Sequence, residues 1–90
     1  MPDLTIDETK LGHIFRDAEG HFREDTDANR RLLIEVASRR ENFLGTDRAG
    51  NDWYAENRSG GTQIWVRVRG GKIVNGGLNQ RSRDSMGRLR

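Results

Sequence analysis

The clearest pattern of apolar and polar positions lies in residues 62–69, TQIWVRVR. Apolar residues alternate there with polar or amphipathic ones, and a period of two predicts a β-strand with one buried face. Ile64, Val66 and Val68 would form that buried face. The opposite face would then present Gln63, Trp65, Arg67 and Arg69.

Two shorter runs flank this strand and are predicted to pair with it. Residues 52–57, DWYAEN, precede it after the turn sequence RSGG at 58–61, and residues 72–77, KIVNGG, follow it after Gly70-Gly71. Paired glycines readily adopt the positive φ angles of tight hairpin turns. The three runs therefore predict an antiparallel meander.

A helical pattern precedes the meander, over residues 27–40. Its apolar residues recur at a spacing that brings them to one side of a helix, and they are Leu32, Leu33, Val36 and Ala37. Asp25 or Thr26 is placed to accept hydrogen bonds from the first free N–H groups of this helix. A sheet with one apolar face needs a cover, so the stripe is expected to pack on Ile64, Val66 and Val68.

The remaining segments carry weaker signals. Residues 1–10 are polar and predict a loose lead-in. A short helix ending near Gly20 is predicted next, and because Gly12 interrupts it, a partly extended segment is the alternative. Residues 41–51 read as a loop rich in turn residues, with Phe43 and Leu44 as a buried anchor pair. We therefore predict a single α+β domain over 1–80, with N-terminal helical segments packed on a small antiparallel meander of at least three strands. Residues 81–90 have no periodicity and predict a basic, flexible tail.

Composition and charge narrow the function. The chain has 90 residues and no cysteine, which excludes a disulfide framework and a cysteine-based zinc finger. No apolar run reaches the length of a membrane span. Residues 1–27 carry eight acidic against three basic side chains, whereas residues 57–90 carry eight basic against one acidic. A polyanion contacted by the second half fits this distribution, and a solvated basic tail is the alternative.

The central strand and the two histidines carry the candidate chemistry. An aromatic ring between polar and guanidinium groups suits single-stranded nucleic acid, because bases stack and phosphates pair with arginine. The alternative is that Trp65 packs beneath the N-terminal segment and the arginines are merely solvated. His13 and His21 could supply the acid and the base of metal-independent RNA cleavage, or they could be ordinary surface residues. Their spacing matches no zinc-ligand pattern, so we predict no metal site.

A series of short motifs runs through residues 12–79: GHIFR at 12–16, GH at 20–21, DT at 25–26, NR at 29–30, NFLGTD at 42–47, GNDWYA at 50–55, GTQIW at 61–65 and GKIVNGG at 71–77. In this order they resemble the toxin domains at the C-terminal ends of large secreted bacterial proteins, including contact-dependent inhibition toxins. Such domains also occur beside phage head-morphogenesis modules. The arrangement is similar to the superfamily that unites barnase, EndoU, the tRNase colicins and RelE.

The resemblance implies which residues would form the site. In EndoU-like members, histidines from the helical part face a threonine or serine and an aromatic residue on the sheet. The implied catalytic residues are His13, His21, Arg16 and Thr62, and the implied substrate-binding residues are Gln63, Trp65, Arg67, Asn75 and Asn79. EndoU-type sites also use a lysine. Neither Lys10 nor Lys72 is clearly placed for that role by the sequence, and Arg16 or Arg67 would substitute for it.

The resulting functional prediction is a monomeric, metal-independent and cofactor-free endoribonuclease toxin. It would cleave RNA, with tRNA one candidate target, by attack of the 2′-OH, leaving a 2′,3′-cyclic phosphate. The resemblance further implies delivery as the tail of a larger protein, action in the cytoplasm of a target bacterium, no contact with membrane, and a cognate immunity protein as partner. The alternative is a non-catalytic RNA-binding or phage-associated module that uses the tryptophan and arginine face of the sheet.

Overall fold

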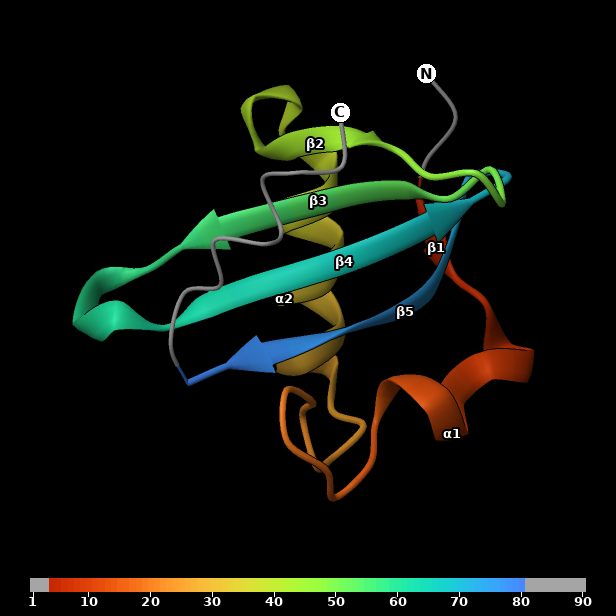
Figure 1. Cartoon of the computed structure of the whole chain (residues 1–90). Coiled ribbons are helices and arrows are strands. Elements are labelled where there is room, and N and C mark those ends of the chain that lie inside the picture. Colours follow the sequence, from red (N-terminus) through yellow and green to blue (C-terminus); the bar gives the residue numbers. More distant parts are fainter. Residues whose placement is uncertain (1–3, 81–90) are drawn as a thin grey trace.

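A computed structural model of the protein describes residues 4–80, which form a five-stranded sheet with one long helix across one of its faces (Figure 1). The strands are β1 (Thr5–Ile6), β2 (Phe43–Thr46), β3 (Asp52–Asn57), β4 (Gln63–Arg69) and β5 (Lys72–Asn79). Their order across the sheet is β1-β5-β4-β3-β2, and only β1, beside β5, runs parallel to its neighbour. The predicted α+β class is confirmed, as is the antiparallel meander β3-β4-β5. The predicted tail at 81–90 lies outside the described residues.

The helix α2 (Asp27–Ser38) begins at its predicted cap. The Thr26 hydroxyl accepts a hydrogen bond from the backbone N–H of Asn29 at 3.1 Å. The helix ends two residues before the predicted boundary of 40, because Arg39 turns to an extended conformation and the 3-10 turn η2 (Arg40–Asn42) follows. The carbonyl of Val36 at this helix end accepts two hydrogen bonds, one from the Arg39 N–H at 3.4 Å and one from the side-chain amide of Asn42 at 3.0 Å.

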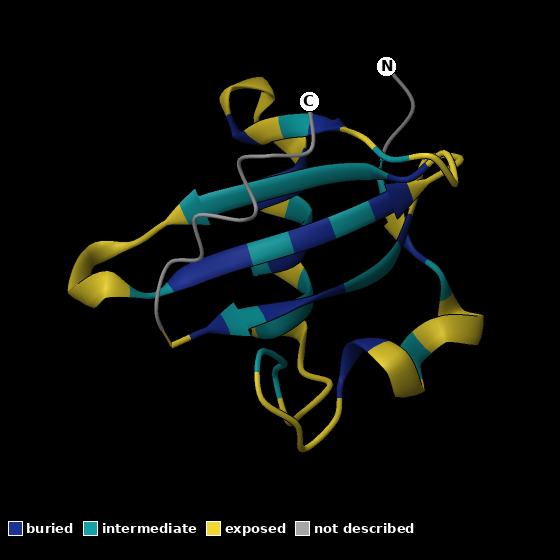
Figure 2. Ribbon diagram, viewed as in Figure 1, coloured by how far each residue is buried: buried dark blue, intermediate teal, exposed yellow. Residues whose placement is uncertain are grey.

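The core lies between α2 and the sheet (Figure 2). Leu33, Val36 and Ala37 of α2 and the predicted inner face of β4, formed by Ile64, Val66 and Val68, are all at most 5% exposed. Burial of each larger aliphatic side chain contributes about 1.5–3 kcal/mol. On β4 the buried residues alternate with half-buried Trp65 and Arg67, which confirms the predicted alternation and leaves those two side chains on the face away from α2.

The N-terminal segment is more ordered than its polar sequence indicated, and the prediction of a loose lead-in is wrong for residues 5–10. Strand β1 pairs with β5, and the Asp7 N–H continues the pairing by donating to the carbonyl of Ile73 at 3.0 Å. The 3-10 turn η1 (Glu8–Lys10) and the single helical turn α1 (Leu11–Ile14) follow. The predicted helix at 11–20 stops at Ile14, because Phe15 forms a β-bridge with Phe22 instead.

The predicted loop at 41–51 also contains a strand, β2, so that prediction is wrong for residues 43–46. Phe43, predicted as one of a buried anchor pair, is 38% exposed on this strand. Gly45 has a φ of 143°, and the register between β2 and β3 shifts between Phe43 and Gly45. A glycine at this irregularity allows a short edge strand in a segment whose sequence resembles a turn. The predicted turn at 58–61 is confirmed as η3 (Ser59–Gly61), with positive φ at Gly60 and Gly61. None of the helices within residues 4–80 has the length and apolar character needed to cross a membrane.

Candidate functional site

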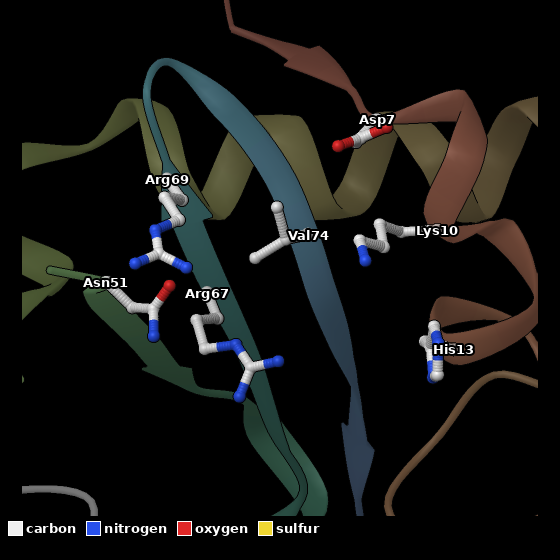
Figure 3. A pocket seen from close by; sticks show the side chains of 7 residues that line it. All are labelled: Asp7, Lys10, His13, Asn51, Arg67, Arg69 and Val74. Atoms are coloured by element: carbon white, nitrogen blue, oxygen red, sulfur yellow. The ribbon is translucent and has the colours of Figure 1, made fainter. Parts of the chain in front are cut away.

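A cleft of about 430 Å³ opens beside the uncovered face of the sheet (Figure 3). Arg67, Arg69 and Asn51 lie on one side of it, Lys10 and His13 lie on the other, and Val74 lies between the two sides. Asp7 completes the lining. Three basic side chains and one imidazole thus face a single carboxylate, which makes the cleft attractive to anions.

Lys10 and His13 reach the cleft together because they are three residues apart across the junction of η1 and α1. Residues at this spacing share one side of a helical segment. The parallel pairing of β1 with β5 fixes this segment beside the sheet. Both side chains are exposed, and neither forms a hydrogen bond or an ion pair with any residue in 4–80. They are therefore available to a ligand.

The carboxylate of Asp7 has a structural role as the cap of η1. Its carboxylate accepts hydrogen bonds from the Thr9 hydroxyl at 2.6 Å and from the Thr9 backbone N–H at 3.0 Å. These bonds, and secondarily the charges of Lys72 and Lys10, lower the pKa of Asp7 below its ordinary value. The carboxylate caps η1 and stays ionised at neutral pH.

The floor of the cleft depends on an irregularity in β5. Arg67 pairs with Asn75 and Val68 pairs with Ile73, so Val74 is an extra residue with no partner on β4. An extra residue of this kind is a β-bulge, which redirects side chains and is common beside functional sites. Ile73 is buried in the core, whereas Val74 is half-buried and lines the cleft.

The arginine side of the cleft is supported by two stacked indole rings. The rings of Trp53 and Trp65 lie 5.8 Å apart with an interplanar angle of 23°, and the guanidinium carbon of Arg67 lies 5.6 Å from the Trp53 ring centroid. The Trp65 indole N–H donates to the carbonyl of Gly20 at 2.8 Å, and that of Trp53 donates to the carboxylate of Asp47 at 2.9 Å. Both rings are thereby held in place, and Trp53 makes a cation–π contact with the Arg67 guanidinium.

Asp47 organises the turn between β2 and β3. Its carboxylate also accepts hydrogen bonds from the backbone N–H groups of Ala49 at 3.0 Å and Asn51 at 2.9 Å, and from the Asn51 side-chain amide at 3.1 Å. The hydrogen bond from Trp53 and then the backbone bond from Asn51 are the main reasons why the pKa of Asp47 lies well below its usual range. Arg69 donates to the carbonyl of Ala49 in the same turn. One carboxylate therefore places Asn51 and Trp53 together.

Replacing Asp47 with asparagine is expected to lower Tm by several degrees at pH 7, because an amide cannot accept all of these hydrogen bonds. A carboxylate with a depressed folded pKa contributes stability that is complete above its unfolded pKa, ordinarily 3.8, and is lost as pH falls below that value. The Tm difference between wild type and Asp47→Asn, measured by circular dichroism, should therefore begin to shrink below about pH 4 and keep shrinking as the pH falls toward the lowered folded pKa of Asp47. Exposed Asp17, changed to asparagine, is the matched control. Curves that stay parallel in acid would contradict this role.

The sequence-predicted His21 lies outside the cleft lining. Its Nδ1 bonds with the carbonyl of Ile14 at 3.1 Å, and its Nε2 lies 3.3 Å from a guanidinium nitrogen of Arg16. A carbonyl can only accept, so Nδ1 donates and Nε2 accepts from Arg16. The imidazole also meets the Trp65 ring edge-on, with centroids 5.5 Å apart. The structure thus brings His21, Arg16 and Trp65 together, whereas His13 is the histidine that lines the cleft.

The remaining predicted residues are placed along the meander. Thr62 and Gln63 lie at the start of β4, whereas Arg69, which lines the cleft, ends it. Gln63 and Asn79 are each 5% exposed, and the amide of Asn79 donates to the side-chain oxygen of Gln63 at 2.9 Å. Asn75 sits opposite Arg67, and its side-chain oxygen accepts from the N–H of Gly76. Of the nine predicted residues, His13 and Arg67 line the cleft.

Sequence reasoning missed Lys10, Asn51 and Asp47 as site residues. The three-residue spacing of Lys10 and His13 was the available signal for the first. Among residues 4–80, no three histidine or acidic side chains lie close enough to hold a metal ion. Comparison with protein-family models, with curated proteins and with solved structures finds no match to this chain.

Proposed function

We propose that this protein is a metal-independent endoribonuclease whose catalytic centre is the cleft around His13. The observation that supports this most is the position of an exposed imidazole opposite Arg67 and Arg69, with Lys10 beside it (Figure 3). Imidazole is the side chain best suited to proton transfer near neutral pH, and the cations would offset the charge of a phosphodiester.

The proposed reaction is an internal transesterification of RNA. The ribose 2′-oxygen attacks the adjacent phosphorus, the bond from phosphorus to the 5′-oxygen breaks, and a 2′,3′-cyclic phosphate and a 5′-OH are formed. No water is consumed, so the proton lost by the 2′-OH reappears on the 5′-oxygen. A single imidazole can carry that proton, and we assign this task to His13. Lys10, beside His13, would stabilise the negative charge of the phosphorane.

The place of His21 in this proposal differs from that of His13. Both of its ring nitrogens are engaged by Ile14 and Arg16, and its edge contacts Trp65. We therefore assign His21 to holding the segment around Gly20 on the sheet, with Arg16 as its partner. Thr62 and the buried amides of Gln63 and Asn79 would support that end of the meander.

The biological setting of the proposal rests on the resemblance of the motifs in residues 12–79 to bacterial toxin domains. RNA, with tRNA a candidate, would be the substrate in the cytoplasm of a target cell. A producing cell would need an immunity protein, and an acidic surface on that protein would complement the cationic cleft. Expression of the chain in bacteria without such a protein should stop growth.

One observation favours a rival function, a non-catalytic RNA-binding module. The cleft contains one histidine, whereas the separate acid and base of this reaction are commonly two side chains. A binding module, including a phage-associated one, would use the same cationic and aromatic face without needing His13.

The deciding experiment is incubation of the purified chain with total bacterial RNA in EDTA, with products separated on a denaturing gel. The proposal expects discrete fragments with 2′,3′-cyclic phosphate ends. An RNA with a 2′-deoxy substitution at the cut position is the matched substrate control and should stay intact there. Intact RNA at a large excess of folded protein would reject the nuclease and favour the binding module.

A further inference from the structure

The two tryptophans and Arg67 form a layered stack that ends at the cleft. Trp65 contacts Trp53, and Trp53 lies beneath the guanidinium of Arg67. Arg67 lines the cleft, whereas neither indole is among the lining residues. The Arg67 guanidinium is therefore the end of this series of contacts that a ligand can reach.

Trp65 itself is poorly placed to stack a base. Its ring has Trp53 on one side and the edge of His21 nearby, and its N–H is bonded to Gly20. Trp65 instead stacks on Trp53, and Trp53 in turn contacts the guanidinium of Arg67. Guanidinium planes stack on nucleobases in RNA-binding sites much as aromatic rings do.

Two polar atoms at this end of the stack have unused bonding capacity. The Nε of Arg67 is buried and has no hydrogen-bond partner among residues 4–80, which is unfavourable in a folded protein. The Asn51 side chain donates through its nitrogen to Asp47, which leaves its oxygen as the atom that can accept a hydrogen bond from a ligand. Both residues line the cleft on the same side (Figure 3).

The size of the cleft limits what can bind there. Its volume of about 430 Å³ falls at the lower end of the range for small-molecule pockets, about 300–1,000 Å³. A paired base in a duplex has both faces covered by its neighbours and cannot stack on a side chain. The cleft thus fits one unpaired nucleotide.

We infer that the sheet side of the cleft is a nucleobase subsite for single-stranded RNA, in which one unpaired base stacks on Arg67 and turns a donor edge to Asn51. Lys10 and His13 then face the ribose and phosphate from the opposite side. The inference rests on the proposed function in taking RNA as the ligand, but it concerns binding and not cleavage.

The test uses a fluorescent, single-stranded 2′-O-methyl oligonucleotide, which lacks the attacking 2′-OH and stays intact whether or not the protein is a nuclease. A series of the same strand with one abasic position at a time measures the contribution of each base. One position is expected to lose at least about fivefold in affinity on base removal. The fully paired duplex of the same sequence should also bind at least about fivefold more weakly than the single strand.

The variant Arg67→Lys distinguishes the contribution of base stacking to RNA affinity from that of positive charge. Lysine keeps the positive charge but has no plane on which a base can stack, so the variant should bind the complete and the abasic strands equally. The matched control is Arg31→Lys, on the exposed side of α2, which should retain the wild-type difference.

Three outcomes would overturn the inference: no binding of the complete strand, an abasic series without a sensitive position, or duplex affinity equal to that of the single strand. A persistent base effect in folded Arg67→Lys would also overturn it. Tight, base-dependent binding in a protein that leaves natural RNA intact would support the subsite while rejecting the nuclease. Cleavage of natural RNA by a protein whose affinity does not depend on any single base would support the nuclease and reject the subsite.

Discussion

Replacing His13 with alanine is expected to lower the rate of RNA cleavage by at least about 10²-fold, the lower bound for loss of a general acid–base group. The Tm should change little, because the imidazole is exposed and forms no hydrogen bond with residues 4–80. Initial rates on a defined RNA in EDTA and a thermal melt by circular dichroism measure the two effects. The variant thereby separates a chemical role from a structural one.

His21→Ala is the matched comparison, since it removes the same side chain from outside the cleft. It should lower Tm by several degrees, because the bond to the carbonyl of Ile14 and the edge contact with Trp65 are both lost. Its residual activity, measured well below its own Tm, should exceed that of His13→Ala. If His13→Ala melted early, or if only His21→Ala were inactive, the assignment of His13 to proton transfer would be wrong.

The parts of the fold that the sequence predicted correctly are those specified locally. The alternation along β4 and the stripe of α2 each follow one face of one element, and Thr26 caps the helix through a bond only three residues long. The missed strands β1 and β2 depend on partners elsewhere. Two residues, Thr5–Ile6, form a strand only because β5 offers a free edge, and nothing in a polar decapeptide indicates that edge.

The candidate site was hard to predict for the same reason. His13 and Arg67 are 54 positions apart in the chain and share a cleft only because β1 pairs with β5 in parallel. Lys10 lies on the same segment as His13, and its place in the cleft depends on the same pairing of β1 with β5, which the sequence did not predict. Asn51 looked like an ordinary turn residue, and its position follows from hydrogen bonds to Asp47 that also hold Trp53. Sequence patterns show which residues share an element, but not which elements meet.

The face of the sheet away from α2 has two unlike halves, which are joined by the stacked indole rings of Trp53 and Trp65. At the end of β4 that Arg69 occupies, the face is open and cationic. Toward the start of β4, the segment 20–21 lies on β5 and bonds to Trp65. Because Trp65 stacks on Trp53 and Trp53 supports Arg67, a change in the covered half should reach the cleft without altering any residue that lines it.

Gly77→Ala tests this connection and should be among the most destabilising single substitutions in the chain. A Cβ at position 77 would lie 2.0 Å from the carbonyl oxygen of Gly20 and 2.7 Å from the Cα of His21, so backbone must move. Overpacking of this kind costs about 1–3 kcal/mol, and in a domain of this size each kcal/mol lowers Tm by roughly 4–8 °C. The expected loss in a thermal melt is therefore about 4–24 °C.

Gly12→Ala is the matched control, because a Cβ there meets no atom within 4 Å. It lies in α1 and should leave the Tm unchanged or raise it slightly. In nitrogen-15 spectra of Gly77→Ala, the resonance of the Trp65 indole N–H should shift, because its bond to Gly20 is lost. The difference in affinity between the complete and the abasic strand should also become smaller.

An unshifted Trp65 resonance and a wild-type melt would show that the segment 20–21 does not rest on β5. A shifted resonance with an unchanged base effect would instead show that the stack does not transmit the change to Arg67.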